Sequence, residues 1–337
     1  MVTRRELLAS LASLVGSASG KTVRLKADTT ANTLQGLSSY AVSGSSRTTD
    51  ERTADQQTAK AASMRFGYAA ITWGSELAQA MDDIASVGFQ GIQLRGEAFA
   101  QFGDRPAALR EALERHHLTF VALSSGNLSI DPAREREELA THVQHAQFVR
   151  ATGGLYLQVI DERPKGRAIT ADDYRRLGRL MTELGKRTAD VGVPLVYHHH
   201  MNSLGERPKE VEAVLDAADR KYVRVLFDVA HYQQGGGDPV ADLRKYREWI
   251  EVLHLKDVRT VPAAPGSSGP ASAAYQFVEL GRGRVDLPGV FAALRDIKFT
   301  GWAVVELDRV PDAGRTAKES AEINKRYLIG KGFGIGG

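Results

Sequence analysis

Four segments in the C-terminal half of the sequence each end a short apolar run with a residue type that commonly binds metal ions. These residues are His198, Asp228, His254 and Glu306. One imidazole or carboxylate from each segment would give a mixed nitrogen and oxygen set, which suits Mn²⁺, Co²⁺, Fe²⁺, Mg²⁺ or Zn²⁺. Because the sequence has no cysteine, a metal must be held by His, Asp, Glu or water. If the four segments converge, the sequence predicts a site for one divalent ion.

Each of the four residues also has an ordinary structural explanation when it is taken alone. An aspartate after a strand often caps a helix, and a single histidine is often a satisfied residue at a rim. Glu306 could pair with an arginine. The metal hypothesis therefore depends on several ligand types occurring together. Five of the nine histidines fall between residues 198 and 254, and four consecutive segments each supply one possible ligand.

Other polar and aromatic side chains follow the same apolar runs. Lys256 lies two residues beyond His254, so both side chains are expected on the same face of a strand. Lysine and histidine can both carry protons in catalysis. Trp73 follows the first apolar run and could cover the apolar face of a sugar. The candidates for moving protons or binding substrate are His200, His231, Lys256, Glu306 and Trp73.

Short β-rich runs alternate with longer amphipathic stretches after Met64, which is typical of repeated βα units and a parallel sheet. The expected strands cover residues 66–71, 91–94, 118–123, 154–159, 194–197, 223–227, 251–255 and 301–306. The clearest helical patterns cover residues 75–87, 132–152, 171–191, 208–218 and 287–296.

Eight such units between residues 64 and 337 favour an α/β fold of the (β/α)₈ TIM barrel type, which is commonly ~250 residues long. The alternative is an open doubly wound sheet, but no G-x-G-x-x-G sequence follows the first strand. In a barrel the C-terminal ends of the strands meet at one mouth, so the four ligand types can converge. Residues 260–274 are rich in Pro, Gly, Ala and Ser, and we expect an insertion with little chemistry of its own.

The first 63 residues differ in character from the rest. Residues 1–20 place Arg4 and Arg5 before a short apolar stretch, which resembles a twin-arginine export signal. Residues 21–63 are polar and poor in aromatic residues, so we expect a disordered leader or linker there. The protein is then expected to be periplasmic or otherwise exported, or cytoplasmic if translation starts at Met64.

The charge distribution argues against two classes of partner. Lys and Arg number 44 and Asp and Glu number 41, and the resulting net charge of +3 lies entirely within residues 1–63. A neutral body is a poor electrostatic partner for nucleic acid or an anionic membrane. We therefore expect a small-molecule ligand, and the sequence leaves open whether the chain forms a homo-oligomer.

The sequences YHHHM at 197–201, FDVAH at 227–231, HLKDV at 254–258 and VVE at 304–306 resemble the xylose isomerase-like TIM barrels, which include many sugar isomerases and epimerases. The His-rich and HLKDVR phrases are most similar to those of inosose dehydratases. The resemblance implies one divalent metal bound by Asp228, His254 and Glu306, with Lys256 and His231 contacting the substrate. His198 stands where most members carry glutamate, which removes one carboxylate that a two-glutamate epimerase would use.

We therefore expect a metal-dependent isomerase or epimerase that acts on a keto or aldo sugar or a cyclitol through an enediolate. An inosose dehydratase-like lyase is the alternative, since both reactions begin with loss of a proton next to a carbonyl. An apurinic endonuclease-like nuclease fits less well, because such enzymes need a basic surface and more metal ligands. A barrel that binds sugar without catalysis is also a weaker hypothesis.

Overall fold

Eight parallel strands form a closed barrel in the computed structural model, which describes residues 64–262 and 274–336. Around the barrel the strands follow the order β1-β10-β7-β6-β5-β4-β3-β2. Their bounds are β1 Arg65–Ala69, β2 Gly91–Arg95, β3 Thr119–Leu128, β4 Tyr156–Asp161, β5 Leu195–His198, β6 Val223–Asp228, β7 Ile250–Leu255 and β10 Trp302–Val305. The prediction of a (β/α)₈ barrel is confirmed, and the doubly wound alternative is wrong, because β1 pairs with both β2 and β10.

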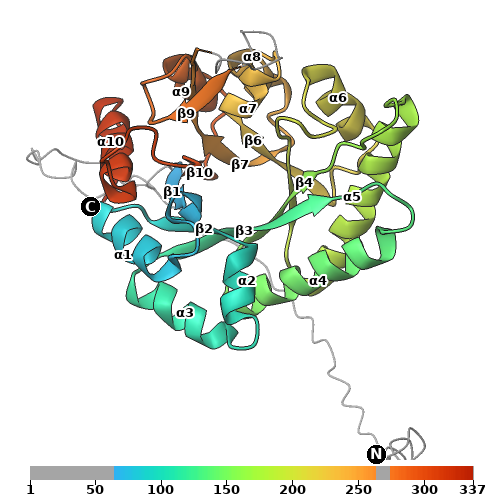
Figure 1. The fold of residues 1–337 in the computed structure, drawn as a ribbon, viewed down its shortest axis with the longest axis horizontal. Coiled ribbons are helices and arrows are strands. Elements are labelled where there is room, and N and C mark those ends of the chain that lie inside the picture. Colours follow the sequence, from blue (N-terminus) through green and yellow to red (C-terminus); the bar gives the residue numbers. More distant parts are fainter. Residues whose placement is uncertain (1–63, 263–273, 337) are drawn as a thin grey trace, which may run out of the picture. The chain divides into compact units, whose positions relative to one another are not determined.

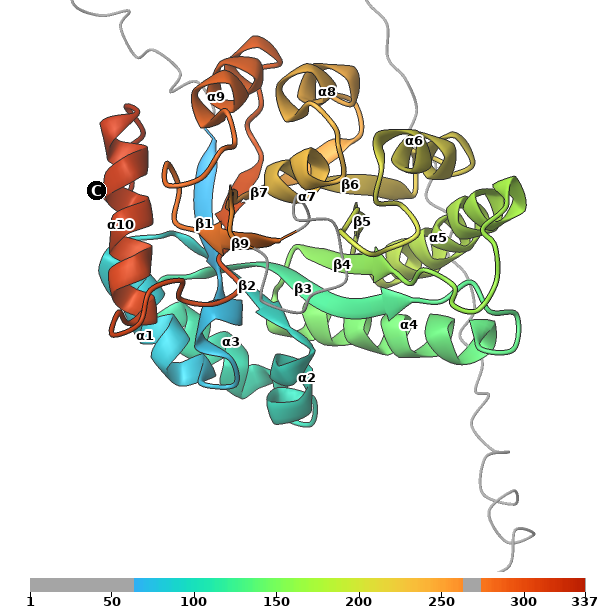
Figure 2. The same cartoon turned by 45° about the horizontal axis from the view of Figure 1, so that its top comes forward.

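Helices surround the strands on the outside of the barrel (Figures 1 and 2). They are α1 Leu77–Val87, α2 Gly96–Phe102, α3 Pro106–Arg115, α4 Glu135–Thr152, α5 Ala171–Val191, α6 Pro208–Asp216, α7 Val229–Gln234, α8 Pro239–Lys245, α9 Leu287–Asp296 and α10 Ala317–Gly330, with a short 3-10 helix at Ala70–Trp73. Among the described residues, none of these helices combines the length and apolarity needed to cross a bilayer.

Polar side chains cap the starts of several helices, among them α5 and α7. In α5 the Thr170 backbone N–H donates to the Asp173 carboxylate at 2.8 Å, as part of a capping box. Asp228 closes β6 and caps α7 through its side chain. Asp228, a candidate metal ligand, therefore both ends a strand and caps the next helix.

The inside of the barrel is filled at its N-terminal end. Trp302 is 2% exposed and belongs to an interior apolar cluster with Val121, Val196 and Val304. A side chain at Gly91 would bring its Cβ to 2.5 Å from the Trp302 ring, so only glycine fits beside the indole. Because this end is closed, space for a ligand remains at the C-terminal end of the strands.

A two-stranded antiparallel sheet, β8 Asp257–Thr260 and β9 Tyr275–Val278, stands beside the barrel mouth. The sequence predicted only an insertion at residues 260–274, so this hairpin was not predicted. The Asp257 carboxylate fixes its base by accepting backbone N–H groups of Val258, Gly281, Gly283 and Val285. Phe277 on β9 consequently lies over the Lys256 ammonium, 4.0 Å from the ring centroid.

Three of the sequence predictions fall outside the described residues. The export signal at 1–20 and the linker at 21–63 belong to residues that the structure does not describe, as do residues 263–273 within the insertion. The export and domain-boundary hypotheses therefore remain predictions.

Candidate metal centre

Asp228 lies at the centre of the candidate site, at the C-terminal end of β6. Its Oδ1 accepts the backbone N–H groups of Ala230 at 2.9 Å and His231 at 2.8 Å, which is the helix-capping role considered from the sequence. Its Oδ2 is buried and has no hydrogen-bond partner. One carboxylate oxygen therefore orients the side chain, and the other faces the barrel mouth.

This free oxygen is one of three candidate ligand atoms that lie close together, with His254 Nδ1 and Glu306 Oε2. Asp228 and His254 are paired residues on β6 and β7, and His254 Nδ1 lies 3.3 Å from Asp228 Oδ2 and 3.4 Å from Glu306 Oε2. Both His254 Nδ1 and Asp228 Oδ2 are buried and lack hydrogen-bond partners. Ligands that share one ion at about 2.0–2.2 Å stand about 3.0–3.5 Å from one another, so the observed spacing fits a divalent metal. Buried polar atoms without a hydrogen-bond partner are otherwise costly.

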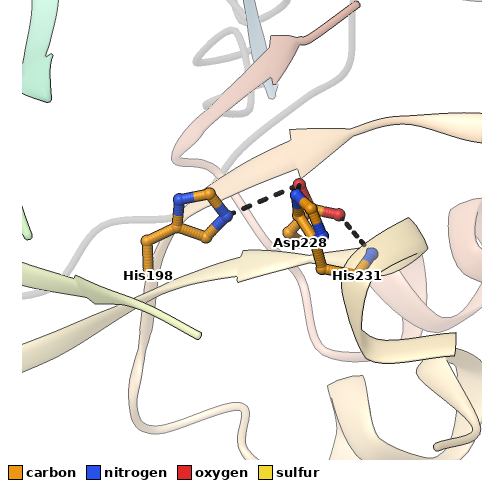
Figure 3. Close-up of side chains that lie close together, drawn as sticks. All are labelled: His198, Asp228 and His231. Atoms are coloured by element: carbon orange, nitrogen blue, oxygen red, sulfur yellow. Dashed lines mark hydrogen bonds and ion pairs between the residues drawn. The ribbon is translucent and has the colours of Figure 1, made fainter. Parts of the chain in front are cut away.

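His198 also approaches Asp228 Oδ2, with its ring centroid 4.6 Å from that of His254. Its Nε2 is 3.6 Å from Asp228 Oδ2, and it also lacks a hydrogen-bond partner. Figure 3 shows His198 and His231 beside Asp228, and His231 Nε2 lies 3.9 Å from the same Asp228 Oδ2 atom. Two groups of three ligand atoms thus share Asp228, one with His254 and Glu306 and the other with His198 and His231.

The site holds Asp228 and Glu306 ionised and His198 neutral. Burial alone would raise the pKa of Asp228, but the neighbouring histidines and Lys256 hold it well below its ordinary value. Burial opposes ionisation of Glu306 as well, yet His254 and Lys256 lower its pKa to about 2. Burial lowers the pKa of His198 to about 4. Neutral imidazole and ionised carboxylate are the protonation states that bind metal.

Lys256 is fully buried immediately beyond β7. Its Nζ lies 2.8 Å from Glu306 Oε1, 2.5 Å from Asp308 Oδ1 and 3.3 Å from His231 Nε2. Although burial favours the neutral amine, the two carboxylates raise the pKa of Lys256 above its ordinary value. Lys256 is therefore an ammonium group paired with Glu306 and Asp308.

A cavity of about 500 Å³ opens above these residues. Its lining includes these polar residues: Arg95, Glu97, Ser124, Ser125, Asn127, Gln93, Gln158, His198, His200, Glu306 and Asp308. Donors and acceptors thus face the cavity from several strands, which suits a ligand with many hydroxyl groups.

His200 reaches this cavity from the loop after β5. Its Nδ1 lies 2.8 Å from the Met201 carbonyl oxygen, which can only accept, so Nδ1 carries the proton and Nε2 is left as a base. The loop is held by Asp161, whose carboxylate accepts backbone N–H groups of Leu204 and Gly205. A Cβ at Gly205 would lie 2.0 Å from the Tyr197 hydroxyl, so the close approach requires glycine.

Two predicted substrate contacts are not at the cavity surface. Trp73 is 8% exposed, packs edge-on against Tyr68 and donates its indole N–H to Asp83 Oδ2 at 2.8 Å. The ring turns toward α1, where this hydrogen bond holds it, and the contact of Trp73 with a sugar face stays a prediction. His231 is also buried, beneath His200, with the two ring centroids 3.8 Å apart. It contacts Lys256 rather than the cavity.

Two glutamines that the sequence analysis missed connect the histidines across the barrel. Gln93 on β2 and Gln158 on β4 are both buried, and each lies between two apolar residues of its strand. Gln93 contacts His254, and Gln158 contacts His198. The available signal was a glutamine in the middle of two expected buried strands, where a polar side chain needs a partner.

Comparison with known proteins agrees with this architecture. The family model described as xylose isomerase-like TIM barrel matches residues 81–327. The chain is 27% identical over 296 residues to an inosose dehydratase of Lacticaseibacillus casei, covering 79% of this chain and 96% of that protein. It is similar in fold to a solved IOLI protein with a binding zinc atom (TM-score 0.64, 19% identity, 79% and 97% covered). A solved L-ribulose 3-epimerase is similar to the same degree (TM-score 0.64, 18% identity, 80% and 94% covered).

Proposed function

Because this chain belongs to the xylose isomerase-like TIM barrel family, we propose that it is a divalent-metal-dependent hydro-lyase that removes water from a polyhydroxylated ketone of the keto-cyclitol class. The observation that carries the proposal is a buried ammonium, Lys256, placed next to the candidate metal ligand Glu306. Similarity to an inosose dehydratase over 96% of that protein supports the same reaction class. The order of the two hypotheses drawn from the sequence is thereby reversed.

Asp228, His254 and Glu306 are the residues that would hold the ion. A bound divalent ion would polarise the substrate carbonyl and lower the pKa of the adjacent C–H. Their two carboxylates and one imidazole form a nitrogen and oxygen set that does not distinguish between several divalent metals. Glu306 has two roles in this arrangement, since Oε2 faces the ion site and Oε1 holds Lys256.

The chain supplies a base and an acid on the same side of the cavity. His200 Nε2 is free to accept the proton next to the carbonyl, because Nδ1 donates to Met201. Lys256 is held as an ammonium behind Glu306 and Asp308, which line the cavity, so it can supply the proton for the departing β-hydroxyl through these carboxylates. Both residues contact His231, so they lie on one side of the site. Breaking the C–H and C–O bonds then forms a C=C bond and releases water, and solvent restores both protonation states.

An epimerase would need proton carriers on opposite faces of the reacting carbon. His198 replaces the strand-five carboxylate that could serve there, and burial keeps the pKa of its imidazole near 4. A neutral, buried imidazole on that face is a poor acid and a weaker base than a group poised near neutral pH. This asymmetry favours elimination over epimerisation.

The test is to incubate the metal-loaded full chain with 2-keto-inositol, and separately with ketoses, in D₂O. We expect an enone or diketone product that absorbs in the ultraviolet, and loss of that product in His200→Gln. His116→Gln is the matched control, because His116 pairs with Asp82 on the outer surface. Deuterium incorporation without water loss would instead assign an isomerase or epimerase, and no reaction with any substrate would favour a binding protein.

A further inference from the structure

We propose that the Gln93–Gln158 pair forces His198 and His254 into the same tautomer, so that His254 binds the metal while His198 presents an N–H group to the substrate. Gln93 and Gln158 are then positioning residues, and the ion has one imidazole ligand rather than two. The inference rests on the metal site of the proposed function and specifies how its ligands are selected.

A continuous chain of four polar side chains crosses the barrel below the cavity. His254 Nε2 lies 2.9 Å from Gln93 Oε1, Gln93 Nε2 lies 3.2 Å from Gln158 Oε1, and Gln158 Nε2 lies 2.9 Å from His198 Nδ1. All four residues are 3% exposed or less. Water therefore does not compete for these contacts, and each group must be satisfied by its neighbour in the chain.

An amide has one donor end and one acceptor end, so the chain has a direction. In the direction above, His254 donates from Nε2 and His198 accepts at Nδ1, so a neutral imidazole carries its proton on Nε2 in both residues. If both amides are reversed, both imidazoles carry the proton on Nδ1. The remaining arrangements place two amide N–H groups or two carbonyl oxygens against each other between Gln93 and Gln158.

The two imidazoles face the metal site through different nitrogens. His254 presents Nδ1 and His198 presents Nε2, and both atoms lack partners. When both rings are the same tautomer, only one of these two atoms has a free lone pair. This conclusion holds for either direction of the amide chain, so it does not depend on how the amide oxygen and nitrogen atoms are assigned.

The surroundings select His254 as the ligand. Its Nδ1 lies between two carboxylate oxygens, at 3.3 Å from Asp228 and 3.4 Å from Glu306. His198 Nε2 approaches only Asp228, at 3.6 Å, and His198 lines the cavity. The His198 N–H then faces an oxygen atom of a substrate bound in the cavity. His198 is therefore not the fourth metal ligand that the sequence suggested.

Cadmium NMR can count the nitrogen ligands directly. The full chain is labelled with ¹⁵N-histidine and loaded with ¹¹³Cd²⁺, and ring nitrogens coupled to cadmium are assigned with His254→Gln and His198→Gln. We expect a single coupled nitrogen, Nδ1 of His254, and a proton on His198 Nε2. Two coupled nitrogens would overturn the inference while leaving the metal site intact. A protein that binds no cadmium would overturn the metal site, and the inference with it.

Two isosteric variants should allow both His254 and His198 to bind the metal. A carboxylate accepts at both ends, so Gln158→Glu or Gln93→Glu lets both histidines donate into the chain and frees His198 Nε2 to bind. Each variant should gain a second cadmium-coupled nitrogen. Gln101→Glu is the matched control, because Gln101 is exposed and contacts only the Ser75 carbonyl. If both folded variants retain a single coupled nitrogen, the amide chain does not select the ligand.

The metal-free protein gives an independent readout that does not depend on how the variants fold. Long-range ¹H–¹⁵N spectra distinguish the two tautomers of each imidazole. We expect His198 and His254 both to carry the proton on Nε2. Opposite tautomers in the wild-type protein would contradict the inference.

Discussion

Lys256 and Glu306 are 50 residues apart in sequence, yet Lys256 Nζ and Glu306 Oε1 are 2.8 Å apart at the ends of the neighbouring strands β7 and β10. Glu306 Oε2 faces His254 and Asp308 binds the other side of the ammonium. The contact joins the candidate metal centre to the candidate acid. It also explains how a lysine with no exposed surface remains charged, since two carboxylates offset its lost hydration.

Replacing Lys256 by methionine should remove the acid without removing the ion. We expect kcat to fall about 10²- to 10⁴-fold, the usual contribution of a positioned proton donor. Metal stoichiometry should be unchanged, because Lys256 is not a ligand. Steady-state kinetics and elemental analysis of the same preparation check both statements. A Lys256→Met protein with wild-type kcat would remove Lys256 from the mechanism.

Asp308→Asn should change the pH dependence of the reaction. Asp308 helps to raise the pKa of Lys256, and burial acts in the opposite direction. Without the Asp308 charge the lysine loses its proton at lower pH, so the alkaline decline in kcat/KM should move to lower pH than in the wild type. Asp312→Asn is the control, because Asp312 pairs with arginines instead. An alkaline limb that moves upward or stays fixed would contradict this role.

The fold was predictable because its signals are local and repeated. Each expected strand overlaps an observed one. The proximity of Asp228, His254 and Glu306 was predictable because the C-terminal strand ends of a barrel meet at one mouth. The family resemblance inferred from the same segments is confirmed by the family model over residues 81–327.

Other features depend on contacts that sequence position does not reveal. From the sequence alone, the indole of Trp73 could face either the barrel mouth or α1. Its hydrogen bond to Asp83 places the ring against α1, and this contact is known only from the folded structure. The hairpin at β8 and β9 needs the four backbone contacts of Asp257, which come from residues up to 28 positions away. Gln93 and Gln158 are 65 residues apart, so neither predicts the other.

Trp73→Phe should affect stability rather than substrate binding. Phenylalanine retains an aromatic contact with Tyr68 but leaves the buried Asp83 Oδ2 without its indole donor. We expect the free energy of unfolding to fall by about 1–3 kcal/mol, the usual cost of such a lost partner. KM should stay at the wild-type value. Chemical denaturation and kinetics test the two parts separately, and a raised KM with unchanged stability would return Trp73 to the substrate site.

Removal of residues 1–63 should leave the barrel intact. The closed strand order and the candidate ligands lie within residues 64–336. The leader is too polar to contribute much buried apolar surface. We expect an unchanged melting temperature and kcat for a chain beginning at Met64. A truncated protein that is insoluble or melts well below the full chain would show that the leader contributes to the fold.

The most direct test of the central claim is the divalent metal content of protein purified without chelator, measured by elemental analysis alongside activity. We expect one ion per chain in the wild type, loss of that ion in Asp228→Asn and His254→Gln, and loss of activity on treatment with EDTA that added metal restores. Absence of any divalent metal from the wild type, with activity indifferent to EDTA, would contradict the account.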